Sequence, residues 1–174
     1  MSLDLSLRLQ RVVPFDSVLA RTREVLRELL RVDAVPLLLA ELTPRDKAAR
    51  HKPSLENRLV DVAFPGAYIG FEGDDPIVSF LVIDGTYSMR VALSSGRTPE
   101  AEVLTAAAAI ALSQLMNGTE IGDYGHHWID QDESVPEEFM GRLALTESQS
   151  DFAEAIQLVH RKLAIHERYP LPKS

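Results

Sequence analysis

Hydrophobic positions recur with two different periods near the start of the chain. Leucines at every second position from Leu3 to Leu9 alternate with polar residues, which predicts a strand with one buried face. From Val18 to Leu30, apolar pairs recur every three to four residues and predict an amphipathic helix with Asp16 or Ser17 as its N-cap. Charges on the outer face are spaced for i,i+3 ion pairs, namely Glu24 with Arg27 and Glu28 with Arg31.

Short apolar runs in the next part of the chain predict strands. The run from Pro36 to Leu42 is apolar almost throughout and indicates a strand covered on both faces. Leu59–Phe64 and Ala67–Phe71 predict two more strands, each followed by a turn that contains Gly or Pro. Before these two strands, Thr43–Ser54 is polar and partly basic, with two prolines, so we expect an exposed loop there. Glu72, Asp74 and Asp75 are interpreted as a solvated turn.

A β-hairpin is predicted over residues 77–93. Asp84-Gly85 stands between two β-rich runs, and this dipeptide favours a two-residue hairpin turn. A two-residue turn fixes the register, and this register places apolar side chains on one face. The expected cross-strand pairs on that face are Val82 with Tyr87, Phe80 with Met89, and Val78 with Val91.

An alanine-rich helix is predicted from Pro99 to Met116. Thr98 is a suitable N-cap, and Asn117-Gly118 supplies the residues that commonly end a helix. Small residues on several sides allow this helix to pack closely against a sheet and a second helix at once. The apolar run from Val103 to Met116 is too short to span a bilayer, so we expect a buried helix.

The last third of the chain predicts one strand and two helices. The strand is Thr119–Asp123, and an acidic loop with aromatic residues follows it at 124–133. Ser134–Glu137 and Thr146–Gln149 both have the spacing of a capping box and each precedes an amphipathic pattern. His160 falls on the second of these helices, where we expect it to be half-buried and inert.

The complete pattern is β-α-β-β-β-ββ-α-β-α-α. It predicts a single α+β domain over residues 1–168, with a mostly antiparallel sheet of about five to seven strands packed by helices. A chain of 174 residues suits one domain with a substantial core. Residues 169–174 contain two prolines and are expected to form a loosely held tail.

Charge is unevenly distributed along the chain. Residues 1–60 hold 11 Lys/Arg and 8 Asp/Glu, whereas residues 61–174 hold 7 and 18, giving −8 in total. This field argues against nucleic acid as a ligand and favours a basic partner. The sequence has no cysteine, no secretory leader and no membrane span, so a cytoplasmic location is expected.

Common catalytic and cofactor motifs are missing from the sequence, and we predict no cofactor. The residues best suited to hold a metal ion are Asp123, His126 and His127, which would support a small metal-dependent hydrolase. Adjacent histidines in an extended segment point to opposite sides, however, and three or four ligands must converge on a metal. Catalysis is therefore the alternative hypothesis.

The segment Glu120–Glu138 is the candidate recognition surface. It holds seven acids and no Lys or Arg, with aromatic residues between them. Aromatic anchors within one sign of charge are typical of protein-binding surfaces. The alternatives are that Trp128 packs into the core and that the acids are merely solvated. The predicted partner-binding residues are Tyr124, His126, His127, Trp128, Asp130, Asp132 and Glu133.

The passage Ala106–Glu133 runs from the alanine-rich helix through the Asn-Gly turn and the short strand to the aromatic loop. It resembles a segment of small bacterial immunity proteins from polymorphic-toxin and contact-secretion systems. That resemblance implies a cytoplasmic α+β domain without enzyme activity that neutralises a toxin by binding it. A further alternative is a homodimer or larger homo-oligomer that associates through the more polar hairpin face.

Overall fold

The computed structural model describes residues 4–42, 58–83, 86–94, 96–123, 128–129 and 132–168. The strands are β1 Asp4–Arg8, β2 Val13–Pro14, β3 Leu38–Leu42, β4 Leu59–Val60, β5 Ala67–Phe71, β6 Val78–Val82, β7 Ser88–Leu93, β8 Ile121–Gly122 and β9 Glu133–Ser134. The helices are α1 Phe15–Leu30, α2 Pro99–Leu115, α3 Pro136–Leu143, α4 Phe152–His160 and α5 Ala164–Arg168. The predicted tail and the basic loop at 43–54 lie outside the described residues.

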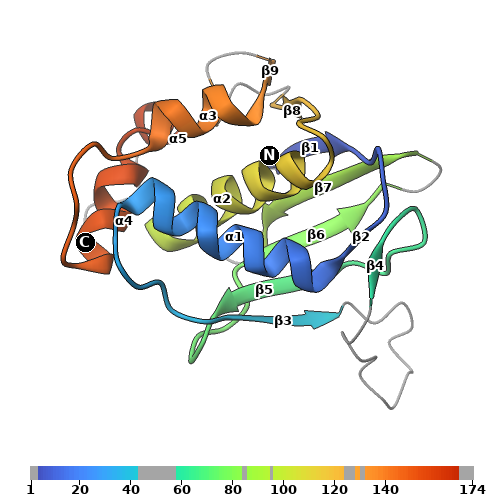
Figure 1. Ribbon diagram of the computed structural model, residues 1–174, viewed down its shortest axis with the longest axis horizontal. Helices are drawn as coiled ribbons and strands as arrows, with labels where there is room; N and C mark the ends of the chain where they lie inside the picture. Colours follow the sequence, from blue (N-terminus) through green and yellow to red (C-terminus); the bar gives the residue numbers. More distant parts are fainter. Residues whose placement is uncertain are drawn as a thin grey trace.

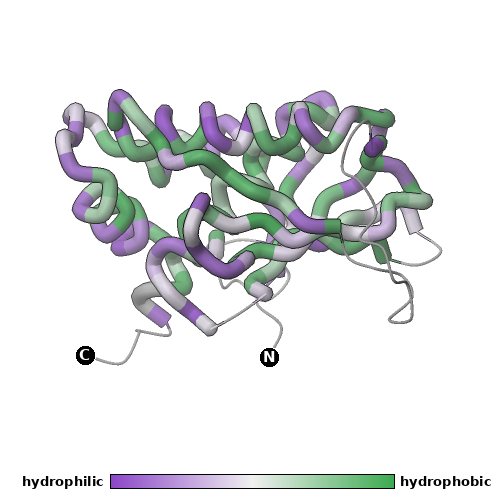
Figure 2. Tube along the Cα trace, turned by 90° about the horizontal axis from the view of Figure 1, so that it is seen from below, coloured by the Kyte–Doolittle hydropathy of each residue, from purple (hydrophilic) through white to green (hydrophobic). Residues whose placement is uncertain are grey.

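Seven strands form one sheet in the order β3-β5-β6-β7-β1-β8-β9, and neighbouring strands in it are antiparallel. β2 and β4 form a separate two-stranded sheet. Helices α1 and α2 lie across one face of the large sheet (Figure 1). Along the helix at the top of Figure 2, hydrophobic positions face the sheet and hydrophilic positions face away. The predicted α+β class and antiparallel sheet are confirmed.

Helix α2 forms the centre of the core. It packs against β1, β6, β7 and β8 on one side and against α1, α3 and α4 on the others. Every residue from Ala101 to Ser113 is buried, which small side chains allow because neighbours can approach the helix closely. Thr98 accepts a hydrogen bond from the Ala101 amide at 3.2 Å, as a cap should. Asn117, with φ 60°, ends the helix, so both predicted ends are confirmed.

The first strand becomes an interior strand of the sheet. β1 pairs with β7 on one side and with β8 on the other. Leu5 and Leu7 are buried against the helices, as their alternation predicts. A segment near the N-terminus therefore holds together two parts of the sheet that are distant from it in sequence. Within the described ranges, each helix is too short or too polar to cross a lipid bilayer.

Helix α1 starts at Phe15, so the prediction of Asp16 or Ser17 as its N-cap was wrong. The Phe15 amide donates to the carbonyl of Arg58, the residue before β4, at 2.8 Å, and this contact fixes where the helix begins. The ion pairs also differ from those expected. Arg21 pairs with Glu24 and Glu28, and the Nε of Arg31 donates to the Leu145 carbonyl instead.

Strand β3 is at the edge of the sheet, so the prediction that both of its faces are covered was wrong. Leu39 is 53% exposed because the helices cover only the opposite face. The expected strand at residues 59–64 is also shorter, since it is limited to β4. Asp61 accepts a hydrogen bond from the Ala63 amide and turns the chain there. Phe64 then packs on Phe15 with ring centroids 5.2 Å apart.

The hairpin of β6 and β7 has a different register from the one predicted. Val82 pairs with Met89 and Phe80 with Val91, two residues away from the expected partners. A shift of two residues leaves each side chain on its own face. The predicted buried apolar face is therefore right for Phe80, Met89 and Val91, whereas Tyr87 is 66% exposed.

The register differs because the connection is longer than a two-residue turn. The Ile83 amide donates to the Ser88 carbonyl at 2.9 Å, so this pair closes the hairpin. Thr86 folds back within the connection, and both its amide and its hydroxyl donate to the Ile83 carbonyl. Asp84 and Gly85, on which the prediction was based, lie outside the described residues.

Neither predicted capping box is formed. Ser134 belongs to β9 and pairs with Ile121, so α3 begins at Pro136 without a side-chain cap. The cap of α4 is Asp151, whose carboxylate accepts a hydrogen bond from the Glu154 amide at 2.7 Å. The segment before it lies against the end of α1, where the Leu145 amide donates to the Leu29 carbonyl. Tertiary contacts thus determine both helix starts.

Candidate functional site

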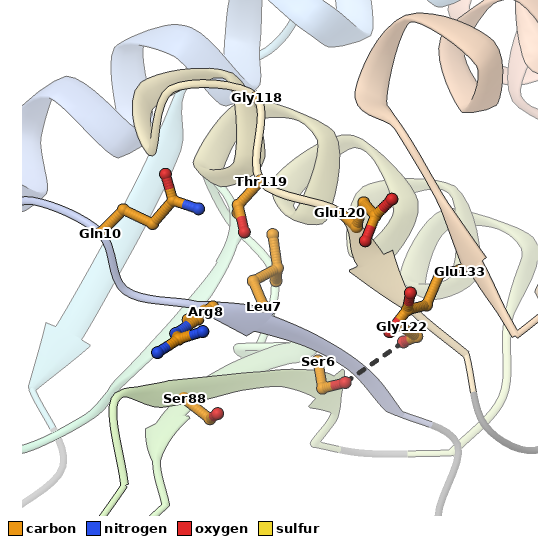
Figure 3. A pocket seen from close by; sticks show the side chains of 10 residues that line it. All are labelled: Ser6, Leu7, Arg8, Gln10, Ser88, Gly118, Thr119, Glu120, Gly122 and Glu133. Atoms are coloured by element: carbon orange, nitrogen blue, oxygen red, sulfur yellow. Dashed lines mark hydrogen bonds between the residues drawn. The ribbon is translucent and has the colours of Figure 1, made fainter.

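A polar groove of about 500 Å³ lies where β1 meets β8. The two strands pair at only two positions, and the Ser6 hydroxyl lies 3.5 Å from the Gly122 carbonyl at the end of that pairing. Beyond it, residues 118–120 and the end of β1 line opposite walls (Figure 3). The groove exists because a short strand leaves this margin of the sheet incompletely paired.

Two carboxylates from different elements meet at this groove. Glu120 precedes β8 and Glu133 is on β9, and the β8–β9 pairing brings both to the groove wall. Figure 3 shows their side chains toward one end of the groove and those of Arg8 and Gln10 toward the other. A groove lined by acids at one end suits the cationic tip of a Lys or Arg side chain.

Further acids extend this charge beyond the groove. Asp132 is exposed just before β9, and Glu137 and Glu138 are exposed in the first turn of α3. The N-terminus of α3 has a positive partial charge that favours carboxylates in its first turn. Five of the six acids that the structure describes between residues 120 and 138 are exposed. We call these five residues the acidic surface: Glu120, Asp132, Glu133, Glu137 and Glu138.

Asp123, the sixth of these acids, is 1% exposed and has a structural role. Its Oδ2 accepts hydrogen bonds from the backbone amides of Trp128 at 2.6 Å and Ile129 at 2.7 Å. The Asp123 amide in turn donates to the Asp132 carbonyl at 2.6 Å. Hydrogen bonds to a carboxylate are about twice as strong as neutral ones, so Asp123 holds both ends of the loop together.

The hydrolase hypothesis places Asp123 in a metal site with His126 and His127. The structure turns the Asp123 carboxylate toward backbone amides in the interior. Both histidines lie outside the described residues, as do Tyr124 and Asp130, so their proposed roles stay predictions. Within the described ranges, no three His, Asp or Glu side chains gather closely enough to hold a metal ion.

Trp128 packs in the core and is 1% exposed. The alternative expectation, that Trp128 packs into the core, is therefore the one that the structure supports. The indole is not on the surface that a partner could contact. Its Nε1 is buried and has no hydrogen-bond partner among the described residues. Leaving a buried donor unpaired costs about 1–3 kcal/mol, so this group calls for an explanation.

Sequence reasoning missed a buried charged cluster that joins α2 to α4. Glu102 is fully buried, and its carboxylate lies 2.6 Å from Arg97 Nε and 2.7 Å from His160 Nε2. The prediction that His160 is half-buried was wrong, since it is 2% exposed, and its Nε2 is hydrogen-bonded to Glu102. A carboxylate in a helix that is apolar on all sides must be buried and paired, and this was the available signal.

The cluster sets the ionisation of Glu102. Burial by itself would raise the pKa of this carboxyl group, because it disfavours the charged form. Hydrogen bonds from His160 and Arg97, with the positive charge of Arg97, outweigh burial and leave the pKa below its usual range. Glu102 is therefore a buried carboxylate that stays ionised and links two helices.

No protein-family model, curated protein or solved structure matches this chain.

Proposed function

We propose that this protein is a non-enzymatic domain that binds a basic protein through the acidic surface. The observation behind this proposal is that two exposed carboxylates line one polar groove and three more exposed carboxylates lie in the same stretch of the chain. Glu120 and Glu133 line it, and Asp132, Glu137 and Glu138 extend the same sign of charge beside it. The groove accepts a Lys or Arg side chain, while the surrounding carboxylates attract the rest of a basic surface.

The charge of the whole chain supports the same partner. Residues 61–174 hold 18 acids and 7 Lys/Arg, so the part of the chain that contains the groove has an excess of negative charge. Such a field raises the rate at which a basic protein meets its binding site, and salt screens it. The resemblance to immunity proteins supports a basic toxin as the partner and the cytoplasm as the location.

The experiment begins with the full chain as bait in extracts of its native host, followed by binding kinetics with the captured protein. The test variant combines Glu120→Gln, Asp132→Asn and Glu133→Gln. We expect its association rate at low salt to fall by about tenfold or more, with a weaker dependence on ionic strength. The unmodified protein should lose this advantage in high salt.

The chain offers a matched control in the exposed turn between β5 and β6. Glu72→Gln, Asp74→Asn and Asp75→Asn together remove the same three charges, and β6, β7 and β1 separate this turn from β8 in the sheet. Binding should be nearly unchanged in this control. Equal losses in the two triple variants would show that net charge alone attracts the partner, and the assignment of the site would be wrong.

A further inference from the structure

A second pocket, of about 280 Å³, lies between α3 and the turn that joins α4 to α5. Its walls are mostly apolar and include Trp128, Ile129, Phe139 and Leu143, all of them buried. None of its lining residues also lines the acidic groove. The two hollows are therefore different sites with different chemistry.

Two cations stand among these apolar residues. Arg142 follows Phe139 by three residues on α3, which places both on the side of the helix that lines the pocket. Lys162 comes from the turn after α4, and its Nζ donates to the Ala144 carbonyl at 2.6 Å. That bond holds the ammonium group near the end of α3 and uses one of its three donor hydrogens.

Trp128 adds a donor to this pocket. It lines the wall, it is 1% exposed, and its indole N–H has no hydrogen-bond partner among the described residues. Buried polar groups in folded proteins are nearly always paired, and a bound acceptor is one of the recognised explanations for an exception. The pocket thus combines an apolar body with three donors, of which two are positively charged.

We propose that this pocket binds a small monocarboxylate with an apolar body, such as an aromatic or branched-chain acid. The carboxylate would accept hydrogen bonds from Arg142 and Lys162, and the Trp128 N–H would gain an acceptor within the pocket. The apolar part would pack between Phe139 and Leu143. A volume of about 280 Å³ is at the lower limit for small-molecule sites, so the ligand must be small.

The test uses the indole N–H itself as the probe. Trp128 is the only tryptophan, so the ¹⁵N-labelled full chain gives a single indole resonance. Phenylacetate and 3-methylbutanoate are titrated, with phenylacetamide as the neutral match for phenylacetate. We expect a saturable shift of the indole resonance with the carboxylates, and binding of the amide at least about tenfold weaker, because it lacks the charge.

Matched variants separate the pocket from general attraction between charges. Lys162→Met and Arg142→Met should each weaken phenylacetate binding by about tenfold, since each removes one charged donor. Arg161→Met is the control, because Arg161 is exposed beside Lys162 and does not line the pocket. The remaining resonances report whether each variant is folded.

Three results would overturn the proposal. The first is an indole resonance that stays in place with both carboxylates at up to about 10 mM in the folded protein. The second is an amide that binds as tightly as the carboxylate, since that shows an apolar pocket without anion recognition. The third is an equal loss in Arg161→Met and Lys162→Met, which assigns the effect to the charge of the whole surface.

Discussion

Helix α2 and the segment Glu120–Glu138 are almost adjacent in the chain, yet they use acidic side chains in opposite ways. Glu102 in α2 is fully buried and bonded to Arg97 and His160. In the later segment, five of the six described acids are exposed. The same type of residue thus links two helices when it is buried and creates a long-range field when it is exposed.

The role of each acid depends on its burial and not on its position in the chain. Asp123 belongs to the acidic segment, yet its buried, hydrogen-bonded environment resembles that of Glu102. Each of these carboxylates is buried and accepts hydrogen bonds from two other residues. The acidic surface therefore depends on a buried acid that closes the loop beside it, just as the core depends on a buried acid that joins its helices.

The largest effect is expected when Glu102 loses its carboxylate. Glu102→Ala leaves Arg97 and His160 without their partner in the interior, and we expect a loss of about 3–5 kcal/mol in the free energy of unfolding. Glu100→Ala removes an acid from the same first turn, where Glu100 is partly exposed, and should cost under about 1 kcal/mol. Chemical denaturation measures both, and similar losses would contradict the distinction between buried and exposed acids.

A smaller loss is expected from Asp123→Ala, which removes the acceptor of two backbone amides. We expect it to cost about 1–3 kcal/mol, with red-shifted Trp128 fluorescence as the loop loosens. Asp33→Ala changes an exposed acid that makes no side-chain hydrogen bond in the described residues, and its stability should stay within about 0.5 kcal/mol. An unchanged Asp123→Ala variant would show that the loop is closed by other contacts.

The Glu102 cluster also predicts a dependence of stability on pH. The folded-state pKa of Glu102 lies below the unfolded value of about 4.3. The stability that Glu102 contributes is therefore complete above that pH and is lost as pH falls through the folded pKa. Unfolding free energies measured from pH 7 down to pH 3 should fall more steeply for the wild type than for Glu102→Gln. Parallel curves would contradict the depressed pKa.

The smallest effect on stability is expected from the variant that should matter most for binding. Glu120→Gln, Asp132→Asn and Glu133→Gln change exposed side chains, and each should alter stability by less than about 0.5 kcal/mol. Thermal unfolding of the triple variant checks this before any binding experiment. A large loss would mean that these acids stabilise the fold, and the comparison with Glu102 would fail.

Local rules predicted part of this structure well. The cap at Thr98, the alanine-rich α2 and the buried leucines of β1 follow from neighbours a few residues away in sequence, and all are confirmed. The alternation in the hairpin likewise placed Phe80 and Val91 on the buried face. Periodicity identifies such faces because each side chain's direction repeats with the backbone.

Errors occurred where a distant contact competed with a local rule. Ser134 has the spacing of a capping residue, but pairing with Ile121 in the sheet takes it away from the helix. The hairpin register moved by two residues because Thr86 and Ile83 bond within a longer connection. Two local patterns can each be favourable, and only the packing of the whole chain chooses between them.

The sequence by itself determined the α+β class, the burial of α2 and the acidic character of residues 120–138. It did so because periodicity and composition are properties of neighbouring residues. Only the tertiary structure decided which acids are buried, since Glu102 meets His160 across 58 positions of the chain. It likewise decided that Trp128 lies in the core beside Arg142 and Lys162. The cost of burying a charge or a donor depends on its partners in space, and those partners come from other elements.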